Sequence, residues 1–415
     1  MTRAAAELRR EREKRVTDAI NLKKTDRVPV LSAIGYFAAK YAGIPCSAAY
    51  YDFDAWYDAY KKTLRDFQPD MIFPQPFTPG KALEIINSRL MRWPGYGVEP
   101  YQGHQSIEID NMQADDLDLF MKDPSDYSLR MHIARTSENL EGLALLPPLA
   151  DLSGGPMGAQ MLALAFTEPE LNKAIRTLQQ AGREMKKWLP KMAKFDKLIR
   201  DMGFPEYFQG AAMPPYDVVS HSMRGMNGTM FDMFRQPDKL IELCEFLLKH
   251  TLDRPAPPPN EYGNTRMFMT VTRGSDDFLS VEQWEKFYWP TFRKLVLGLV
   301  ERGMTPCIFF EGNCTSRMEY LLDFPRGTVL ARLDRTDIFK AKEILKDHVC
   351  IEGNVPSSLL QLGTVQQVKD HCKKLIDVIG KGGGYILAPR SSTDEANPEN
   401  FRAMIEFTKE YGKYS

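Results

Sequence analysis

The 415-residue sequence predicts an α/β fold, a (β/α)8 TIM barrel with a helical cap insertion, and two observations favour it. Short apolar runs alternate with helix-like stretches, which is typical of a parallel sheet whose strands are buried on both faces. Polar and glycine residues follow where those runs end, most clearly three times between residues 304 and 393. In such a barrel the carboxyl ends of the strands carry the active site. The pattern therefore indicates an enzyme with a polar pocket at that face.

Eight short apolar runs are the expected strands, and turn-forming residues bound most of them. In chain order they are Val28–Ala33, Met71–Phe73, Tyr207–Ala211, Met267–Val271, Cys307–Phe310, Val329–Leu333, Val349–Ile351 and Tyr385–Ala388. Eight strands with helices between them is the number in a barrel of this class.

Helix-like stretches separate these strands. The expected helices include residues 1–22, 53–68, 231–250, 339–347 and 365–379. The helix after the fourth strand begins at Ser280, and Gln283 follows three residues later. This is the spacing of a capping box, in which each residue satisfies a backbone N–H of the other.

Two stretches do not fit a simple strand–helix repeat. Residues 85–110 carry alternating apolar side chains, which predicts a short hairpin at the rim of the barrel. Residues 112–200 are mainly helical in pattern and too long for one crossover, so we interpret them as an inserted cap. The proline-rich stretch 253–264 lies between regularly spaced strands and is interpreted as a loop. We therefore expect a single domain over residues 1–415.

Composition and charge argue against several classes of partner and location. A net charge of -1 gives no basis for binding nucleic acid or an anionic membrane. No apolar stretch approaches the ~20 residues that span a bilayer, and the charged N-terminus lacks the apolar core of a signal peptide. Six cysteines in a chain of this length do not form a disulfide framework. We therefore expect a reducing, cytoplasmic compartment.

Five segments together resemble the uroporphyrinogen decarboxylase superfamily. They are DRVPV, YFQGAAMPPYD, FLSVEQWEKFYWP, GNVPSSLL and GGGYILAP. The similarity runs from about Arg15 to the C-terminus and is least in the insertion. The resemblance implies a (β/α)8 barrel and one of two chemistries. One is cofactor-free decarboxylation of porphyrinogen acetate groups, and the other is methyl transfer involving a cobalt corrinoid.

The sequence departs from the decarboxylase pattern of this superfamily at two places. The decarboxylases have an arginine-containing loop after the first strand, where this chain has SAIGYFAAK. They also have an aspartate at the end of the second strand, where this chain has FPQPF with Gln75. An entrance poor in arginine leaves the many carboxylates of a porphyrinogen uncompensated. We therefore expect that uroporphyrinogen is not the substrate.

The sequence also departs from the zinc site of the thiol methyltransferases in the superfamily. Their His-x-Cys after the fifth strand is replaced here by Phe309-Phe310-Glu311, and their cysteine after the eighth by Arg390-Ser391. Zinc prefers nitrogen and sulfur ligands, so its usual ligands are absent. Glu-Gly after the fifth strand resembles the demethylating methyltransferases, whose corrinoid a separate partner protein carries.

Glu311 is the first catalytic candidate because it directly follows the fifth strand. Methyl transfer to cobalt leaves negative charge on the departing group, which a positioned acid neutralises. Burial at a strand end raises the pKa of a carboxyl and suits it to donate a proton. The alternative is a structural ion pair with Arg273 or Arg390.

Further candidates follow the fourth and sixth strands. Arg273 either binds an anionic substrate group or pairs with Asp276 and Asp277, one of which is alternatively a helix cap. Asp334 is the third catalytic candidate, because Asp337 is the expected N-cap of the next helix.

The remaining candidates for substrate binding are polar or aromatic side chains near strand ends. They are Asn354, Asn313, Arg390, His221, Asp276, Tyr36 and Gln75. Asparagine at such positions is alternatively a turn residue, and a lone histidine is more often structural. The candidate metal ligands are Glu311, Cys314, Glu352 and His221, although their spacing matches no recognised ligand set.

Three hypotheses follow from the resemblance. The first is a corrinoid-dependent methyltransferase, or demethylase component, that moves a methyl group between a small organic donor and the cobalt of a corrinoid protein. The second is a cofactor-free decarboxylase of a small acid whose carboxylates Arg273 and Arg390 hold. The third is a barrel that only binds a corrinoid partner. The methyl donor, a bound metal and the oligomeric state stay open, and an oligomer is compatible with the sequence.

Overall fold

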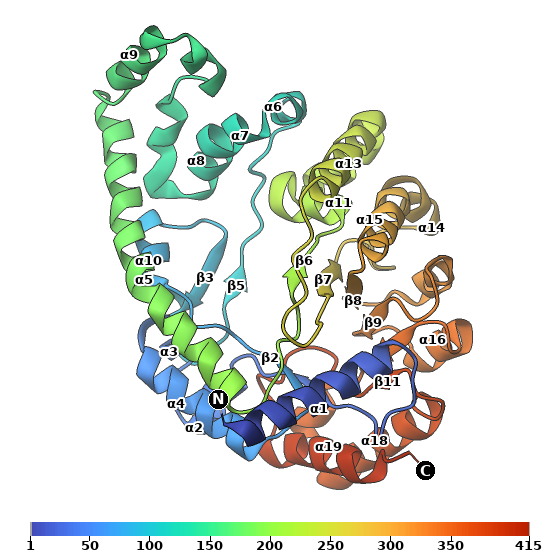
Figure 1. Cartoon of the computed structure of the whole chain (residues 1–415). Helices are drawn as coiled ribbons and strands as arrows, with labels where there is room; N and C mark the ends of the chain where they lie inside the picture. The colour runs from blue at the N-terminus through green and yellow to red at the C-terminus, as the bar shows by residue number, and fades with distance from the viewer. Residues whose placement is uncertain (1, 415) are drawn as a thin grey trace.

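A computed structural model describes residues 2–414 and contains eight parallel strands separated by helices (Figure 1). The strands are β1 (Leu31–Ala33), β2 (Met71–Phe73), β6 (Gly210–Ala211), β7 (Arg266–Val271), β8 (Thr305–Phe310), β9 (Leu330–Leu333), β10 (Cys350–Glu352) and β11 (Tyr385–Ile386). Six of them form one sheet, in the order β6-β7-β8-β9-β10-β11, and β1 pairs with β2. Bridges at Val30–Leu387 and Ala33–Ser392 bring β1 beside β11. The predicted parallel α/β fold is confirmed, with four of the eight strands shorter than expected and β7 and β8 longer.

The ring of strands is not closed. Within residues 2–414 no backbone pairing joins β2 to β6, so a seam separates them. The expected third strand, Tyr207–Ala211, is reduced to two residues in β6. Rings of the preceding residues lie at the seam instead, with the Phe208 centroid 5.5 Å from that of Phe73 on β2. Side-chain packing therefore replaces a backbone ladder at this position.

Successive side chains of the central strands point alternately to the outside and the inside of the barrel, as the geometry of a strand requires. Ile308 and Ile351 belong to the large cluster that the strands share with the surrounding helices. Cys307, Leu330 and Cys350 are in register on neighbouring strands and belong to a separate inner cluster. The two clusters are the outer and inner layers of the barrel core.

Helix α1 (Arg3–Ile20) covers the amino ends of the strands (Figure 1). Its Val16, Ala19 and Ile20 complete the inner cluster, because their spacing places them on one face of the helix. Glu13 of α1 is buried and pairs with Arg266, the first residue of β7, at 2.6 Å. Helix α1 thus closes the amino end of the barrel (Figure 1).

The outer helices follow the expected pattern with one difference. The longer ones are α4 (Phe53–Asp66), α12 (Gly225–Arg235), α13 (Pro237–Leu252), α15 (Trp289–Glu301), α16 (Ile338–Leu345), α18 (Val365–Val378) and α19 (Pro398–Tyr411). The shorter ones are α2 (Phe37–Ala42), α3 (Ala48–Tyr51), α5 (Gly80–Ile86), α11 (Pro215–Asp217), α14 (Val281–Gln283), α17 (Ser357–Leu362) and the irregular turns η4 (Val218–Met223), η5 (Trp284–Tyr288) and η6 (Thr315–Asp323). The single helix expected over residues 231–250 is two helices, because the residue before Pro237 disfavours helical backbone. The capping box of Ser280 and Gln283 is confirmed.

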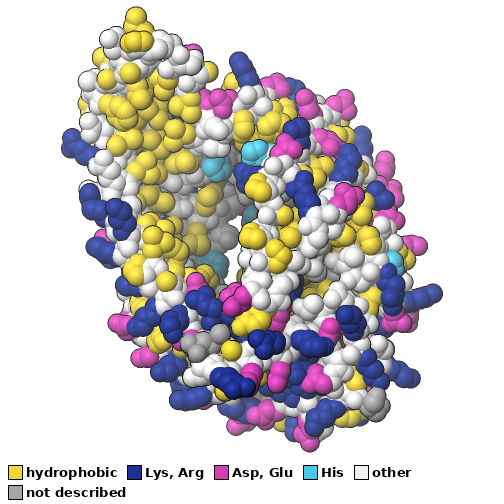
Figure 2. All heavy atoms as spheres, in the orientation of Figure 1, with side chains coloured by type: hydrophobic (Ala, Val, Ile, Leu, Met, Phe, Trp, Pro, Cys, Tyr) yellow, Lys and Arg dark blue, Asp and Glu magenta, His cyan; other side chains and the backbone are white. Residues whose placement is uncertain are grey.

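The insertion forms an arm beside the barrel (Figure 1). Its helices are α6 (Asp116–Lys122), α7 (Pro124–Tyr127), α8 (Ile133–Thr136), α9 (Pro156–Ala165) and α10 (Pro169–Asp201), with turns η1 (Ser128–His132), η2 (Glu138–Leu145) and η3 (Leu149–Ser153). A small sheet of β3 (Met91–Pro94), β4 (Gly97–Val98) and β5 (Gln105–Ser106) precedes it, and the antiparallel pairing of β3 with β5 agrees with the expected hairpin. Figure 2 shows a deep hollow between the arm and the barrel. Over the described part of the chain, every helix is too short or too polar to cross a bilayer.

Candidate functional site

The carboxyl ends of β7, β8 and β9 supply the centre of the candidate site. Register places Thr270, Phe309 and Arg332 side by side on the inner face of the barrel. Two residues further along, Thr272, Glu311 and Asp334 continue the same inner rows. Thr270, Thr272 and Phe309 are only partly buried and Glu311 is exposed, so this end of the barrel is open to solvent. Polar side chains therefore line an accessible mouth.

Glu311 lies at this mouth as expected, but it is not desolvated. Its side chain is exposed, and the Thr272 hydroxyl donates to its Oε2 at 3.0 Å. The proposed ion pair with Arg273 or Arg390 does not form. The burial on which its acid role was predicted to depend is therefore absent, and Glu311 is a solvent-accessible carboxylate at the barrel mouth.

Arg273 also lies at the mouth, but its carboxylate partner is not one that the sequence suggested. Its Nη2 donates to Oε2 of Glu108 at 2.7 Å, and its guanidinium lies 4.9 Å from the ring centroid of Phe278. The expected pairing with Asp276 or Asp277 is wrong. Asp277 pairs with Arg335 at 2.8 Å. Asp276 accepts from the backbone N–H and hydroxyl of Ser316 at the start of η6, so it does not cap the helix at Ser280.

One expected catalytic residue and two expected substrate ligands instead stabilise the loops around the mouth. Asp334 accepts from the backbone N–H of Gly312 at 3.0 Å, which ties the end of β9 to that of β8. Asn354 is buried and donates to the carbonyl oxygens of Asp334 and Thr336. Asn313 accepts from the hydroxyl of Thr315 at 2.7 Å in a local turn, the alternative considered from sequence. These side chains position the mouth and leave little polar surface for a ligand.

Asp217 anchors the loop after β7 and was not singled out from sequence. It is buried and accepts from the backbone N–H groups of Thr272 and Arg273 at 3.0 and 2.8 Å. It also accepts from the Tyr288 hydroxyl at 2.6 Å. Burial raises the pKa of Asp217 to about 6, although these hydrogen bonds act in the opposite direction. The signal available in the sequence was its place at the end of the segment YFQGAAMPPYD.

A buried ion pair lies below the mouth, inside the barrel. Arg332 and Glu352 are in register on β9 and β10, with Nε and Oε1 3.3 Å apart. The Tyr207 hydroxyl donates to the other carboxylate oxygen of Glu352. Burial raises the pKa of Glu352, and the charge of Arg332 opposes that rise. The arrangement makes Glu352 a structural partner of Arg332.

The candidate metal ligands are dispersed. Glu352 is inside the barrel with Arg332, whereas His221 is exposed on η4. Cys314 is buried, and burial raises the pKa of its thiol well above the ordinary range. In the described part of the chain, no three His, Cys, Asp or Glu side chains gather as a metal site would require. The predicted set of Glu311, Cys314, Glu352 and His221 is therefore not assembled.

A second cluster of polar side chains lies near the carboxyl ends of β1 and β11. The Tyr36 hydroxyl is buried and lies 2.9 Å from Nδ1 of His104 and 2.9 Å from the Tyr50 hydroxyl. Asp394, beyond β11, accepts from the Tyr36 backbone N–H at 2.7 Å. Partial desolvation of the ring lowers the pKa of His104, and the charge of Asp394 opposes this. Tyr36 was predicted from sequence, whereas His104 and Asp394 were missed because no motif marks them.

One segment connects the two polar groups across the mouth. His104 contacts Tyr36 next to β1, and Glu108 contacts Arg273 next to β7. Four residues of extended chain span at most about 14 Å, so both contacts are made from one short segment, and we treat them together. Glu311 joins it through Thr272, which precedes Arg273. We call His104, Tyr36, Glu108, Arg273, Thr272 and Glu311 the mouth site.

The last two expected ligands follow the ends of β2 and β11, the two strands that flank β1. Gln75 follows β2, and its backbone N–H donates to the Tyr60 hydroxyl at 2.7 Å. Arg390 follows β11, and within residues 2–414 its side chain takes part in no ion pair. Its Nε is buried without a hydrogen-bond partner in the same part of the chain. Arg390 is thus a cation near the strand ends, and no carboxylate of the described chain forms an ion pair with it.

Comparison with known proteins gives concordant results. The family described as Uroporphyrinogen decarboxylase (URO-D) matches residues 157–411. A uroporphyrinogen decarboxylase of Chlorobium phaeobacteroides is 26% identical over 138 residues, 32% of this chain and 38% of that protein. One of Chlorobaculum parvum is 30% identical over 78 residues, 18% of this chain and 22% of that protein. The match thus spans well under half of the curated relatives. The solved structure of a methyltransferase from Methanosarcina mazei matches 96% of this chain and 98% of its own, with a TM-score of 0.58 and 15% identity, which shows a shared fold.

Proposed function

Because this chain belongs to the uroporphyrinogen decarboxylase family, we propose that it transfers a methyl group from a small organic donor to the cobalt of a corrinoid carried by another protein. Methyl transfer is favoured over porphyrinogen decarboxylation because the arginine side chains at and below the mouth are paired with carboxylates. Arg273 is neutralised by Glu108, Arg332 by Glu352 and Arg335 by Asp277. A porphyrinogen with many carboxylates would find few free cations here, whereas a small neutral donor needs none.

The chemistry requires the donor's heteroatom to leave with an electron pair and then take up a proton. A corrinoid in the Co(I) state supplies the nucleophile that accepts the methyl group. The chain supplies two groups that can stabilise or protonate the departing atom, the carboxyl of Glu311 and the ring of His104. When Tyr36 donates to Nδ1, the proton of neutral His104 sits on Nε2, the nitrogen that Tyr36 leaves free.

A protein partner fits the apolar face of the arm. Met157, Met161 and Leu164 of α9 follow the i, i+4, i+7 spacing of one helix face, and each is at least 49% exposed. Figure 2 shows hydrophobic side chains gathered on the arm beside the hollow. Large exposed apolar patches of this kind mark interaction sites. A corrinoid protein entering the hollow would bring its cobalt to the mouth site.

The test is an anaerobic assay with reduced cobalamin, and then with corrinoid proteins, against a panel of O-, N- and S-methyl compounds. The expected result is loss of the Co(I) absorption together with demethylated product for one class of donor. Absence of both with every donor and every corrinoid source would contradict the proposal.

Decarboxylation is the second candidate, and Arg390 is the observation that favours it. An arginine without a carboxylate partner can hold a substrate carboxylate, and the curated relatives are named decarboxylases. Carbon dioxide release from small carboxylic acids in the absence of any corrinoid would support this candidate. A chain in which Arg390 is changed to Gln would then lose that activity.

A further inference from the structure

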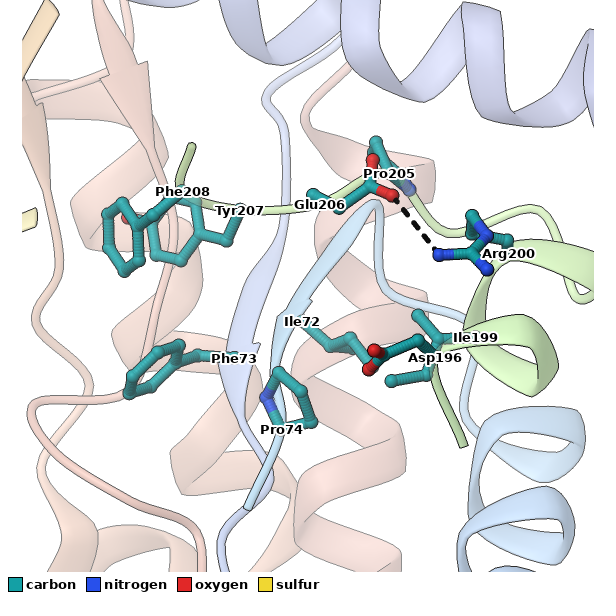
Figure 3. Close-up of a pocket in the computed structure, with 10 residues that line it drawn as sticks. All are labelled: Ile72, Phe73, Pro74, Asp196, Ile199, Arg200, Pro205, Glu206, Tyr207 and Phe208. Carbon is teal, nitrogen blue, oxygen red and sulfur yellow. Dashed lines mark ion pairs between the residues drawn. The ribbon is translucent and has the colours of Figure 1, made fainter. Parts of the chain in front are cut away.

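The seam between β2 and β6 contains a pocket that the proposed methyl transfer does not use. It is a cavity of about 310 Å³ between β2, the segment before β6 and the last turns of α10 (Figure 3). Ile72, Phe73, Tyr207 and Phe208 form its apolar side, and Asp196 and Arg200 its polar side. We call this the seam pocket. Its volume and its mixture of apolar walls with a few polar groups are typical of small-molecule sites.

Three aromatic rings gather on one side of the seam pocket (Figure 3). The centroids of Tyr207 and Phe208 are 4.0 Å apart, and Phe73 meets Phe208 edge-on at 5.5 Å. Phe73 remains 39% exposed despite these contacts. The faces of aromatic rings carry negative electrostatic potential and attract cations. This wall therefore suits an apolar group next to a positive charge.

The opposite side of the seam pocket carries an excess of negative charge. Within residues 2–414 Asp196 makes no hydrogen bond or ion pair, and Arg200 approaches Glu206 only to 3.9 Å. Glu206 also pairs with Arg9, which is itself shared with Glu261. Three carboxylates thus share two guanidinium groups, and Asp196 has no direct ion pair, since Arg200 acts on its charge only at longer range. An anionic ligand would meet an unpaired carboxylate, whereas a cationic ligand would supply the missing charge.

We propose that the seam pocket binds an organic cation, an ammonium group with an apolar or aromatic body. The ammonium group lies against Asp196, and the body packs on Phe73, Tyr207 and Phe208. The pocket exists because the strand ladder is interrupted here and side chains replace backbone pairing. The proposal stands independently of methyl transfer, since the seam pocket and the mouth site share no residue.

The test measures binding of three probes that share one ring and differ in charge: benzyltrimethylammonium, benzyl alcohol and benzoate. Isothermal titration with the full chain should give the tightest binding for the ammonium probe. Asp196→Asn should weaken that binding about tenfold, and Phe208→Leu should weaken it as well. Asp151→Asn, the same change at an exposed position of the arm, should have no effect.

Two results would overturn the proposal. One is binding of benzyl alcohol or benzoate as tight as that of the ammonium probe, which would mean that charge does not select the ligand. The other is unchanged ammonium binding in Asp196→Asn, which would place the probe elsewhere. Asp196→Asn alters an exposed side chain and Phe208→Leu a partly exposed one. A thermal melt of each variant checks that it is folded.

Discussion

At the residue scale, the barrel mouth contains two kinds of polar side chain: some are open to solvent, and others hold loops in place. Asp334, Asn354 and Asn313 are engaged with backbone or neighbouring side chains. Glu311 has one hydroxyl partner and is otherwise free to reach a ligand. Exposure, more than the nearness of a strand end, distinguishes a residue that can act on a substrate.

Glu311→Gln tests whether the carboxyl at the mouth takes part in transfer. We expect the rate of demethylation to fall about 10²-fold or more, because an amide cannot relay a proton from solvent to the departing atom. The melting temperature should not change, since the side chain is exposed. Glu319→Gln, an exposed change on η6, is the control and should retain the full rate. Wild-type turnover in Glu311→Gln would remove this residue from the mechanism.

His104→Gln tests the second polar group in the same assay. We expect kcat to fall about 10-fold or more, and Tyr36→Phe to lower it less, because the ring stays but loses its hydroxyl partner. His250→Gln on the outer helix α13 should have no effect on turnover. If His104→Gln and Tyr36→Phe both retain the wild-type rate, then the group next to β1 only supports the fold.

At the element scale, β9 and β10 are joined inside the barrel by charge as well as by backbone hydrogen bonds. Arg332 and Glu352 are almost fully buried, so neither side chain can be solvated if the other is lost. Removing one partner of such a pair is costly, whereas replacing both with apolar groups is much less so.

Arg332→Met should therefore lower the free energy of unfolding by about 3–5 kcal/mol, because it leaves Glu352 buried without a cation. The double change Arg332→Met with Glu352→Met should recover a large part of that loss. Urea unfolding of the three chains gives the comparison. Arg293→Met breaks an exposed pair with Asp323 and should change stability little. A double variant less stable than Arg332→Met would contradict this prediction, because removal of the unpaired carboxylate would then bring no gain in stability.

At the scale of the whole molecule, we expect the stability of the chain to depend on the protonation of Asp217. The carboxyl is buried in the folded state, with a pKa raised to about 6, above its ordinary value of 3.8. The folded state therefore binds this proton more tightly than the unfolded state does. The contribution of Asp217 to the free energy of unfolding is largest below pH 4 and declines as the pH rises to about 6.

Asp217→Asn removes this titration. Between pH 4 and pH 6.5 the difference in unfolding free energy between wild type and variant should change by about 2 kcal/mol, with the wild type losing the more. Urea titrations at both pH values measure it, and Asp253→Asn on the surface is the control. Parallel pH dependences for wild type and Asp217→Asn would show that Asp217 titrates normally.

The sequence by itself determined the order of the parallel strands, the helical insertion and the capping box at Ser280. These features depend on local periodicity and on residues only a few positions apart, which a linear sequence displays directly. It also placed Glu311 and Arg273 at the carboxyl face, because strand ends are visible as a change from apolar to polar residues. Only the tertiary structure decided the partners of those residues. Glu108 reaches Arg273 across 165 positions, and Tyr207 reaches Glu352 across 145. The open seam likewise depends on how β2 and β6 meet in space, since backbone pairing between distant strands leaves no trace in either strand alone.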